Sequence, residues 1–322
     1  MSETATGMYI DILVVFYIHC TDILNNFRTF APELNKILHR QSKTMTSKVI
    51  LLTGASSGIG FDTAIALSRQ GHKVYAAARR VERMEPLREY GIVPVKMDVT
   101  DEESMQNGVQ TVLTAEGRID VLINNAGYGY FGAVENVPIS DARNQLEVNI
   151  FGLARLCQLV LPVMRKQHSG RIINTSSVAG KSVLYYGAWY HVSKYAVEAF
   201  SDALRMEVKP FGIDVVIIEP GAIKTDWGII AADHLSRTSE GTAYAETGKM
   251  MAHNLRTMYQ SSNLSDPSVV RKAICRAVNA RRPRTRYRIG RMSGAIVFFH
   301  WLLPTRLWDS MMRLMGKTKV AR

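Results

Sequence analysis

The chain has 322 residues, of which 47% are apolar and 21% charged, as in a soluble globular protein with a substantial buried core. Three widely spaced cysteines predict neither a disulfide framework nor a zinc site, so a reducing, cytoplasmic compartment and no bound metal are expected. The formal charge of +12 is concentrated in residues 271–322, which hold 14 Lys or Arg and one acid, Asp309. Because the remainder is close to neutral, the composition excludes a globally basic nucleic-acid-binding protein and indicates a neutral domain with a basic tail.

The first 44 residues differ from the sequence that follows. The stretch 8–20 is apolar, but Asp11 interrupts it and no basic residue precedes it, so a secretory signal peptide is not expected. The first basic residue is Arg28, which also argues against a mitochondrial presequence. We interpret residues 1–44 as an N-terminal extension, either an amphipathic appendage or a segment upstream of a functional start at Met45.

From residue 49 onward, short runs rich in Val and Ile alternate with longer helical segments. The runs lack polar alternation, as expected of parallel strands that are covered on both faces. Strands are predicted at 49–52, 74–78, 93–97, 119–123, 171–174, 215–218 and 286–289. Helices are predicted at 59–70, 102–115, 140–167 and 187–210. This alternation predicts an α/β fold: a doubly wound parallel sheet of about seven strands with helices on both faces, in one domain.

A glycine-rich turn follows the first predicted strand directly. Its candidate cofactor-binding residues are Gly54, Ser56, Ser57, Gly58, Ile59 and Gly60. Three glycines let the chain turn tightly, let its backbone approach a pyrophosphate, and point a helix N-terminus at the negative charge. An ordinary strand-to-helix turn is the alternative, but the position after the first strand of an α/β pattern predicts a dinucleotide site.

The end of the second predicted strand bears on which dinucleotide is bound. An acidic residue there would accept hydrogen bonds from the adenosine ribose and favour NAD. Here Ala78 is followed by Arg79, whose planar guanidinium suits a 2′-phosphate. The alternative is that Arg79 and Arg80 are solvated loop residues. We expect NADP(H) to be favoured over NAD(H).

Tyr190 and Lys194 place a phenol and an ammonium group four residues apart, on one face of a predicted helix. A free tyrosine, with a pKa of about 10, is a poor base near neutrality. A neighbouring ammonium group and an oxidised nicotinamide would lower that pKa. Ser177 follows a predicted strand, and its hydroxyl would hydrogen-bond the substrate oxygen. These residue types suit the interconversion of a carbonyl and an alcohol.

Alternatives to this catalytic set exist within the sequence. Ser176 competes with Ser177, although the spacing to Tyr190 favours Ser177. Tyr185 and Tyr186 compete with Tyr190, but only Tyr190 has a lysine four residues later. A tyrosine and a lysine at this spacing also occur as a surface pair on many amphipathic helices, so the signal depends on its combination with the glycine turn.

Together these motifs resemble those of the short-chain dehydrogenase/reductase family, from residue 47 to about residue 289. The resemblance implies a Rossmann-type domain at residues 45–290 that contains both cofactor and substrate sites. It also implies that Asn149 is a fourth catalytic residue, which holds a water in a proton relay with Lys194. The further cofactor-binding residues it implies are Asp98, Val99, Asn125, Ala126, Gly127, Pro220, Gly221, Ile223 and Thr225, besides Tyr190 and Lys194.

Some of these residues also have a purely structural interpretation. Asp98 would serve as the cap of a helix that begins near Thr100, and Asn125 and Asn149 would be buried, satisfied amides. For the whole protein, the alternative function is a non-catalytic sensor or scaffold that binds NADP without turnover. The complete catalytic set favours the enzyme.

The substrate side is expected to be apolar. The residues expected near the pocket are Tyr128, Tyr130, Phe131, Val178, Leu184, Tyr185, Tyr186, Trp189 and Trp227. They indicate a small lipophilic substrate such as a steroid, a retinoid or another ketone, and residues 223–263 are expected to form a mobile lid. The basic C-terminal extension, 291–322, resembles the hydroxysteroid and retinol dehydrogenase branch. Its apolar part, 295–303, would cover the pocket, contact a membrane peripherally, or pack on its own domain or a partner in a homodimer or homotetramer.

Overall fold

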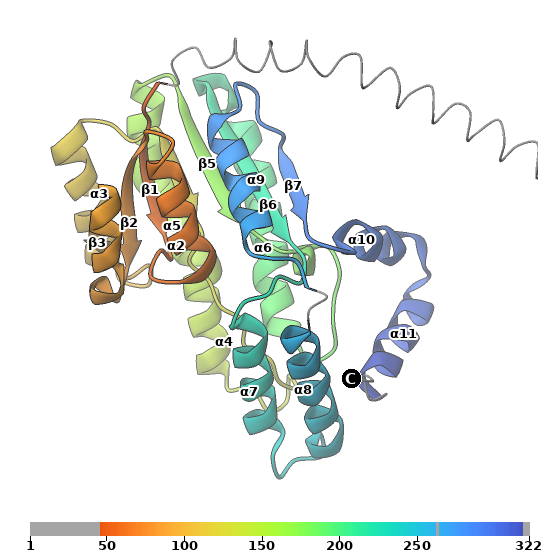
Figure 1. Cartoon of the computed structure of the whole chain (residues 1–322). Coiled ribbons are helices and arrows are strands. Elements are labelled where there is room, and N and C mark those ends of the chain that lie inside the picture. Colours follow the sequence, from red (N-terminus) through yellow and green to blue (C-terminus); the bar gives the residue numbers. More distant parts are fainter. Residues whose placement is uncertain (1–45, 262–263, 318–322) are drawn as a thin grey trace, which may run out of the picture. The chain divides into compact units, whose positions relative to one another are not determined.

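Seven parallel strands form one sheet in the order β3-β2-β1-β4-β5-β6-β7. The computed structural model describes residues 46–261 and 264–317, so the predictions for residues 1–44 and for a start at Met45 lie outside the described residues. The strands are β1 (Val49–Thr53), β2 (Lys73–Ala78), β3 (Val93–Lys96), β4 (Val121–Asn124), β5 (Gly170–Thr175), β6 (Ile213–Pro220) and β7 (Arg286–Ile289). The predicted doubly wound parallel sheet is confirmed, and each strand lies within one or two residues of its predicted bounds (Figure 1).

Helices cover both faces of the sheet and also extend beyond it. Their bounds are α2 (Gly58–Ser68), η1 (Val81–Tyr90), α3 (Glu102–Glu116), α4 (Ile139–Leu146), η2 (Glu147–Phe151), α5 (Gly152–Lys166), η3 (Val178–Gly180), α6 (Ala188–Val208), η4 (Lys209–Phe211), α7 (Trp227–Ser239), α8 (Ala245–Gln260), α9 (Ser268–Asn279), α10 (Ser293–Leu302) and α11 (Thr305–Lys317). Among these, η1, η3 and η4 are 3-10 segments and η2 is a single π-helical turn.

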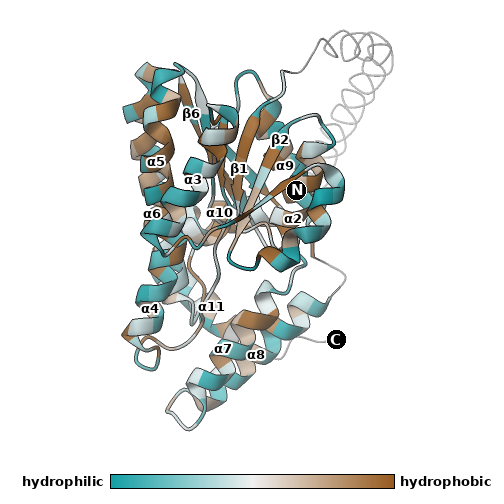
Figure 2. Cartoon of the chain, turned by 90° about the vertical axis from the view of Figure 1, so that its left-hand side faces the viewer, coloured by the Kyte–Doolittle hydropathy of each residue, from teal (hydrophilic) through white to brown (hydrophobic). Residues whose placement is uncertain are grey.

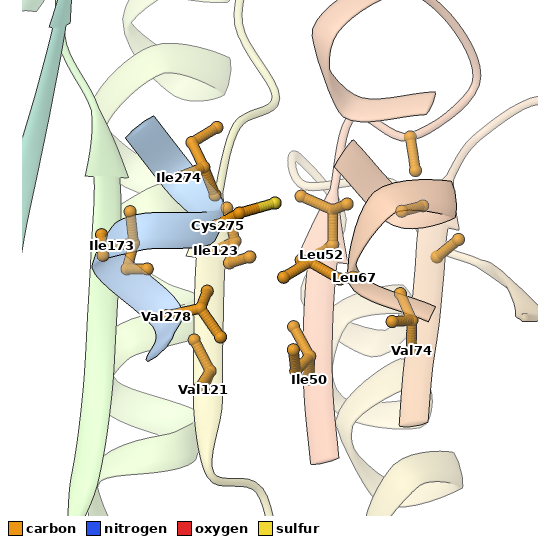
Figure 3. Close-up of a cluster of buried hydrophobic side chains, with 14 of the residues drawn as sticks. Ile50, Leu52, Leu67, Val74, Val121, Ile123, Ile173, Ile274, Cys275 and Val278 are labelled. Carbon is orange, nitrogen blue, oxygen red and sulfur yellow. The ribbon is translucent and has the colours of Figure 1, made fainter. Parts of the chain in front are cut away.

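The strands are apolar because both faces of the sheet are covered. Ile50 and Leu52 of β1 belong to a cluster with Leu67 of α2 and Ile274 of α9 (Figure 3). Leu51, between them in sequence, points to the opposite face, where α3, α5 and α6 supply the cover. The apolar colours in Figure 2 accordingly follow the central strands.

The predicted helix 140–167 is interrupted. It consists of α4, the π-turn η2 and α5, and Asn149 lies in the π-turn. The whole stretch Ile139–Lys166 is the one span in the described residues that is long and apolar enough to cross a membrane. Leu156 and Val160 of α5, however, are fully buried in the core cluster on one face of the sheet, as in the core helix of a globular domain.

The segment expected to be a lid is helical. Helices α7 and α8 pack against each other, and Figure 1 shows this pair projecting from the sheet beyond β6. After β7, α10 packs against η3 and α11 packs against α8. The sequence analysis placed no helix boundaries in these segments or at α9.

Candidate active site

All seven strands run in the same direction, so their carboxyl ends meet at one edge of the sheet. The predicted site residues follow six of these ends: Gly54 after β1, Arg79 after β2, Asp98 after β3, Asn125 after β4, Ser177 after β5 and Gly221 after β6. Helix α6 adds Tyr190 and Lys194, and the Nζ of Lys194 donates to the carbonyl oxygen of Thr175 at the end of β5 (2.9 Å). The topology therefore brings segments from most of the chain to one place.

The turn between β1 and α2 has a backbone that requires its glycines. Gly54 and Gly58 have φ angles of +69° and +54°, which residues with a side chain rarely adopt. A Cβ on Gly60 would lie 2.3 Å from the carbonyl oxygen of Gly54, whereas one on Gly58 would meet no atom within 4 Å. Ser57 makes no side-chain capping hydrogen bond to α2, whose first turn contains no acidic residue. No capping side chain therefore occupies the N-terminus of α2, which fits the binding of a dinucleotide pyrophosphate there.

The segment Asn124–Gly127, at the end of β4, is hydrogen-bonded to this turn. The side-chain amide of Asn125 donates to the carbonyl oxygens of Thr53 (3.2 Å) and Gly54 (3.3 Å). In return, the hydroxyl of Thr53 accepts from the backbone N–H groups of Asn125 and Ala126, both at 3.1 Å. The side-chain nitrogen of the half-buried Asn125 is therefore satisfied, and its bonds hold the glycine turn against the neighbouring strand.

Arg79 and Asp98 lie at the ends of β2 and β3. Arg79 is exposed and makes no hydrogen bond or ion pair to any residue that the structure describes, so its guanidinium is free to meet a ligand. Asp98 accepts from the N–H (3.0 Å) and the hydroxyl (2.8 Å) of Thr100 through one oxygen. The interpretation of Asp98 as a helix cap is wrong, because Asp101 caps α3 by accepting from the N–H of Ser104 at 2.6 Å.

Four of the predicted cofactor-binding residues have side chains that are largely inaccessible to a cofactor. Val99 and Ile223 are buried, and Ile59 packs against the core. Thr225 is half-buried, and its hydroxyl donates to the carbonyl oxygen of Ile223 (3.4 Å). The N–H of Gly221 donates to Ile289 of β7 at 2.7 Å. Binding of a cofactor through these segments would therefore use mainly backbone groups.

The three central catalytic candidates are brought together. Tyr190 and Lys194 lie one turn apart on α6, with the Nζ of Lys194 5.9 Å from the centre of the Tyr190 ring. The hydroxyl of Ser177 lies close enough to Tyr190 to hydrogen-bond its phenolate. The same hydroxyl donates to the carbonyl oxygen of Pro220 (3.2 Å) and accepts from the N–H of Ala179 (3.1 Å). Pro220, expected to bind cofactor, thus also orients the serine.

The electrostatics of these groups reflect their burial. Burial raises the pKa of Tyr190 to about 12, and the hydrogen bond from Ser177 opposes this shift. Burial lowers the pKa of Lys194 to about 8, and the negative charge of Glu198 opposes it. Lys194 does not contribute to the shift of the Tyr190 pKa, and the lowering of the phenol pKa by Lys194 together with an oxidised nicotinamide stays a prediction. The competing Ser176 makes its side-chain contact with the backbone oxygen of Lys194 (3.5 Å), not with Tyr190.

Asn149 lies in the π-turn, and hydrogen bonds fix its side chain. Its Oδ1 accepts from the N–H of Tyr128 (3.0 Å), and its Nδ2 donates to the carbonyl oxygen of Tyr128 (2.9 Å) and to the hydroxyl of Ser193 (3.0 Å). A Cβ on Gly127 would lie 3.1 Å from this Oδ1 and 3.7 Å from the Nζ of Lys194. The interpretation as a buried, satisfied amide is therefore correct for its side chain. The bonds also hold the loop after β4 against α6, beside the lysine.

An apolar cover lies over Tyr190. The rings of Trp227 and Phe131 have centroids 4.9 Å and 6.0 Å from that of Tyr190. Leu235 of α7 and Leu255 of α8 belong to the same buried cluster. These two leucines were not among the predicted site residues, because no helices were assigned within residues 223–263. The signal that would have found them is the helical spacing of apolar residues along α7 and α8.

The other residues that were expected near the pocket lie in different places: some contact α7, and others line a separate groove. Tyr130 packs on His234 of α7, with ring centroids 4.2 Å apart. A separate apolar groove of about 880 Å³ is lined by Gly132, Ala133, Val134, Glu135, Val183, Leu184, Tyr185, Tyr186, Ala188, His191, Val192, Tyr195 and Tyr244. None of the four catalytic candidates lines this groove. His191, which lines the groove, is fixed there by its Nε2, which accepts from the N–H of Leu184 (2.8 Å).

Comparison with known proteins identifies relatives along most of the chain. A family model described as short chain dehydrogenase matches residues 48–233. The chain is 38% identical over 249 residues to the 3-ketodihydrosphingosine reductase of Bacteroides thetaiotaomicron, covering 76% of this chain and 89% of the relative. It is 36% identical over 259 residues to the estradiol 17-beta-dehydrogenase 1 of Rattus norvegicus, covering 76% and 74% respectively.

Solved structures support the same assignment. A short-chain dehydrogenase from Streptomyces avermitilis superposes with a TM-score of 0.70 at 32% identity, over 86% of this chain and all of the other. A serine dehydrogenase complexed with NADP+ (TM-score 0.66, 25% identity) and an NAD+-bound xylitol dehydrogenase (0.66, 28%) cover 76% and 77% of the chain, and 95% and 99% of their own. The chain therefore belongs to the short-chain dehydrogenase/reductase family and is an oxidoreductase that acts on CH–OH groups with a nicotinamide cofactor.

Proposed function

We propose that this protein interconverts a ketone and its alcohol on a lipophilic small molecule, with NADP(H) as cofactor and Tyr190 as general acid and base. The observation that carries the proposal is the surroundings of Tyr190. Its phenol is buried beside the hydroxyl of Ser177, one turn from Lys194 and beneath the ring of Trp227. Proton-transfer groups and an apolar cover thus meet at one point.

Each residue has a defined part in such a reaction. When bound, the nicotinamide supplies or accepts the hydride. Ser177 would hydrogen-bond the substrate oxygen. Because burial raises the pKa of Tyr190 to about 12, its phenol is protonated at neutral pH and holds the proton that a carbonyl oxygen gains on reduction. The ammonium group of Lys194 would stabilise the phenolate that remains.

The lipophilic substrate class has two supports. The cluster over Tyr190 is built from Phe131, Leu235, Leu255 and other apolar side chains, which exclude water and favour an apolar ligand. Two relatives are named for lipophilic molecules, estradiol and 3-ketodihydrosphingosine, that carry a ketone or the corresponding alcohol. A steroid or a long-chain ketone is therefore the preferred candidate.

The preference for NADP(H) depends on Arg79. Ala78 ends β2 without an acidic residue that would bind a ribose 2′-hydroxyl, and Arg79 is exposed directly after it. Solved relatives are bound to NADP+ in one case and to NAD+ in another, so the family allows either cofactor. A guanidinium at this strand end supports the phosphorylated form.

Self-association into a homodimer or homotetramer is part of the proposal. Ile139 of α4 and Phe151 in the π-turn that follows α4 are 55% and 58% exposed. Apolar side chains of this size on a long helix suit an interface between identical subunits. Multi-angle light scattering on the purified chain tests this, and a monomer at micromolar concentration would contradict it.

A substrate panel tests the proposed function. The purified protein is mixed with steroid ketones, 3-ketodihydrosphingosine and the small polar ketone dihydroxyacetone, with NADPH or NADH, and loss of the reduced cofactor is followed by absorbance. Turnover of a lipophilic ketone with a higher kcat/KM for NADPH is expected. A preference for dihydroxyacetone would contradict the substrate class. Tight NADPH binding without any turnover would favour the sensor or scaffold.

A further inference from the structure

Helices α10 and α11 carry large apolar side chains that the described part of the chain leaves exposed. On α10, Phe298 is 52% and Trp301 78% exposed, and Leu302 lies beside them at helical spacing. On α11, Leu307 and Met311 lie about one turn apart and are also exposed. These five residues are called the apolar tail surface. Single exposed apolar side chains are ordinary, but such a group on two consecutive helices marks an interaction surface.

The two helices are fixed to the rest of the domain. Trp308 is 3% exposed, and its indole N–H donates to the carbonyl oxygen of Val183 (3.4 Å). The ring of His300 packs edge-on against Trp308, with centroids 4.9 Å apart. Helix α11 also packs against α8. The apolar tail surface is therefore displayed from an anchored scaffold and does not belong to a fraying end.

Charges on α11 are arranged around the apolar side chains. At about 100° per residue, Leu307 and Met311 lie on one side of the helix. Arg306 and Arg313 lie together on a neighbouring side, about 100–160° around the helix axis from those two residues. Asp309, the only acid after residue 271, lies on nearly the opposite side. Arginine can pack its alkyl stem on apolar surface and extend its guanidinium to a phosphate.

We propose that the apolar tail surface docks this protein on the surface of an anionic lipid bilayer. The aromatic rings lie at the headgroup level and the two arginines of α11 bind lipid phosphates. Helix α10 has ten residues and is too short to span a bilayer. A second copy of the chain is the competing occupant, but residues 271–322 hold 14 Lys or Arg and one acid, so two copies that meet through this segment would repel each other.

Docking by this surface holds the lid of the active site near the bilayer. Helix α11 packs on α8, whose Leu255 belongs to the cluster over Tyr190, and α10 packs on η3, which follows Ser177. A lipophilic substrate would then pass from the bilayer to the site without crossing bulk water. This consequence rests on the proposed function, whereas the docking itself does not.

Flotation of the full chain with vesicles tests the proposal without any substrate. Vesicles of phosphatidylcholine mixed with phosphatidylglycerol should bind the protein, and phosphatidylcholine alone should bind it less. The double change Phe298→Ser and Trp301→Ser should weaken binding by at least about tenfold, because it removes two large apolar contacts. Met206→Ser is the matched control, since Met206 is 73% exposed on α6. It should bind as the parent does.

The charged residues are tested separately. Arg306→Gln and Arg313→Gln should each weaken binding to the mixed vesicles about fivefold, the effect of ~1 kcal/mol per basic residue. Raising the salt concentration should reduce the difference between parent and variants. Arg143→Gln, which changes an exposed arginine of α4, should leave binding unchanged.

The conservative variant Trp301→Phe tests the surface with a change that is not expected to disturb folding. The parent should show a blue shift of tryptophan fluorescence on adding mixed vesicles, and Trp301→Phe should still bind but lose most of that shift. Absence of parental binding overturns the proposal, and so does undiminished binding of the Phe298→Ser, Trp301→Ser variant. A parental dimer that this variant dissociates, without vesicle binding, would instead assign the surface to a second copy of the chain.

Discussion

At the residue scale, the phenol of Tyr190 is the group on which the proposed chemistry depends. Tyr190→Phe removes the transferred proton but changes the side chain by only one oxygen. We expect kcat to fall at least ~10²-fold, the usual effect of losing a general acid or base, with NADPH affinity nearly intact. Tyr195→Phe is the control, because Tyr195 lies on the same helix and is 39% exposed. Full activity in Tyr190→Phe would disprove the mechanism.

Arg79 is the residue that should separate the two cofactors. Arg79→Ala should weaken NADPH binding by roughly 1.5–3 kcal/mol, the value of hydrogen bonds to a charged group, and should leave NADH binding nearly unchanged. Arg80→Ala is the matched control, since Arg80 is also exposed and follows directly in sequence. Titration of each variant with both cofactors measures the difference. Equal losses for NADPH and NADH would show that Arg79 does not recognise a 2′-phosphate.

Lys194 should give the reaction an alkaline limit. Burial lowers its pKa to about 8, so the ammonium is charged below that pH and loses its proton as the pH rises through it. Reduction that needs the ammonium should therefore decline above neutrality. Glu198 opposes the lowered pKa, so Glu198→Gln should lower it further and move the decline to lower pH. Initial rates across pH measure this, and Glu207→Gln, an exposed change on α6, should not move the profile.

At the element scale, the turn between β1 and α2 offers a comparison between two glycines. Gly58→Ala places a methyl group in open space at a φ of +54°, so the protein should fold at a cost of ~1–2 kcal/mol but lose NADPH affinity. Gly60→Ala would place a Cβ 2.3 Å from a backbone oxygen and should lower Tm much more. Melting curves and cofactor titrations distinguish these effects.

A third glycine serves as the control for backbone strain. Gly117 has a φ of +66°, and a Cβ there would meet no atom within 4 Å, but it precedes β4 and so lies at the opposite edge of the sheet. Gly117→Ala should lower Tm about as much as Gly58→Ala and leave NADPH binding unchanged. If Gly58→Ala keeps full affinity, the pyrophosphate does not lie over the start of α2.

Elements with a strong periodic signal could be predicted from the sequence. The strands are short, mainly apolar runs, and their carboxyl ends locate the glycine turn, Ser177 and Asn125 without any structure. The π-turn that holds Asn149 could not be predicted, because it adds one residue to a helix whose hydrophobic pattern is otherwise continuous. The packing of Trp227 on Tyr190 could not be predicted either, because these residues are 37 positions apart and the sequence does not give the orientation of α7, which begins at Trp227.

At the scale of the whole molecule, the sequence predicted which residues gather but not their electrostatic state. Parallel topology requires the segments after β1 to β6 to meet, whatever their side chains. The pKa of Tyr190 depends instead on how completely Phe131 and Trp227 exclude water, which is a property of three-dimensional packing. The anchoring of α11 by Trp308 also depends on three-dimensional packing, because nothing in the local sequence distinguishes the buried Trp308 from the exposed Trp301.

The last prediction concerns how little of the N-terminal part the domain needs. The described contacts of the fold begin just before β1. The guanidinium of Arg118 donates to the carbonyl oxygen of Ser47 (3.0 Å), and the N–H of Lys73 donates to the carbonyl oxygen of Lys48 (2.9 Å). The N–H of Val49 then donates to the carboxylate of Asp120 (2.7 Å). A protein that begins at Met45 retains all of these bonds. We expect it to be soluble, to melt at the parental temperature and to bind NADPH.

A shorter variant provides the contrast. A protein that begins at Leu52 lacks Val49, Ile50 and Leu51, which are buried in the two clusters on opposite faces of the sheet. Burial of each such side chain contributes roughly 1.5–3 kcal/mol, so their loss approaches the whole stability of an ordinary domain. This variant should be insoluble or unfolded. If the variant that begins at Met45 behaves in the same way, residues 1–44 are part of the fold; if only the shorter one does, the domain begins between residues 45 and 52.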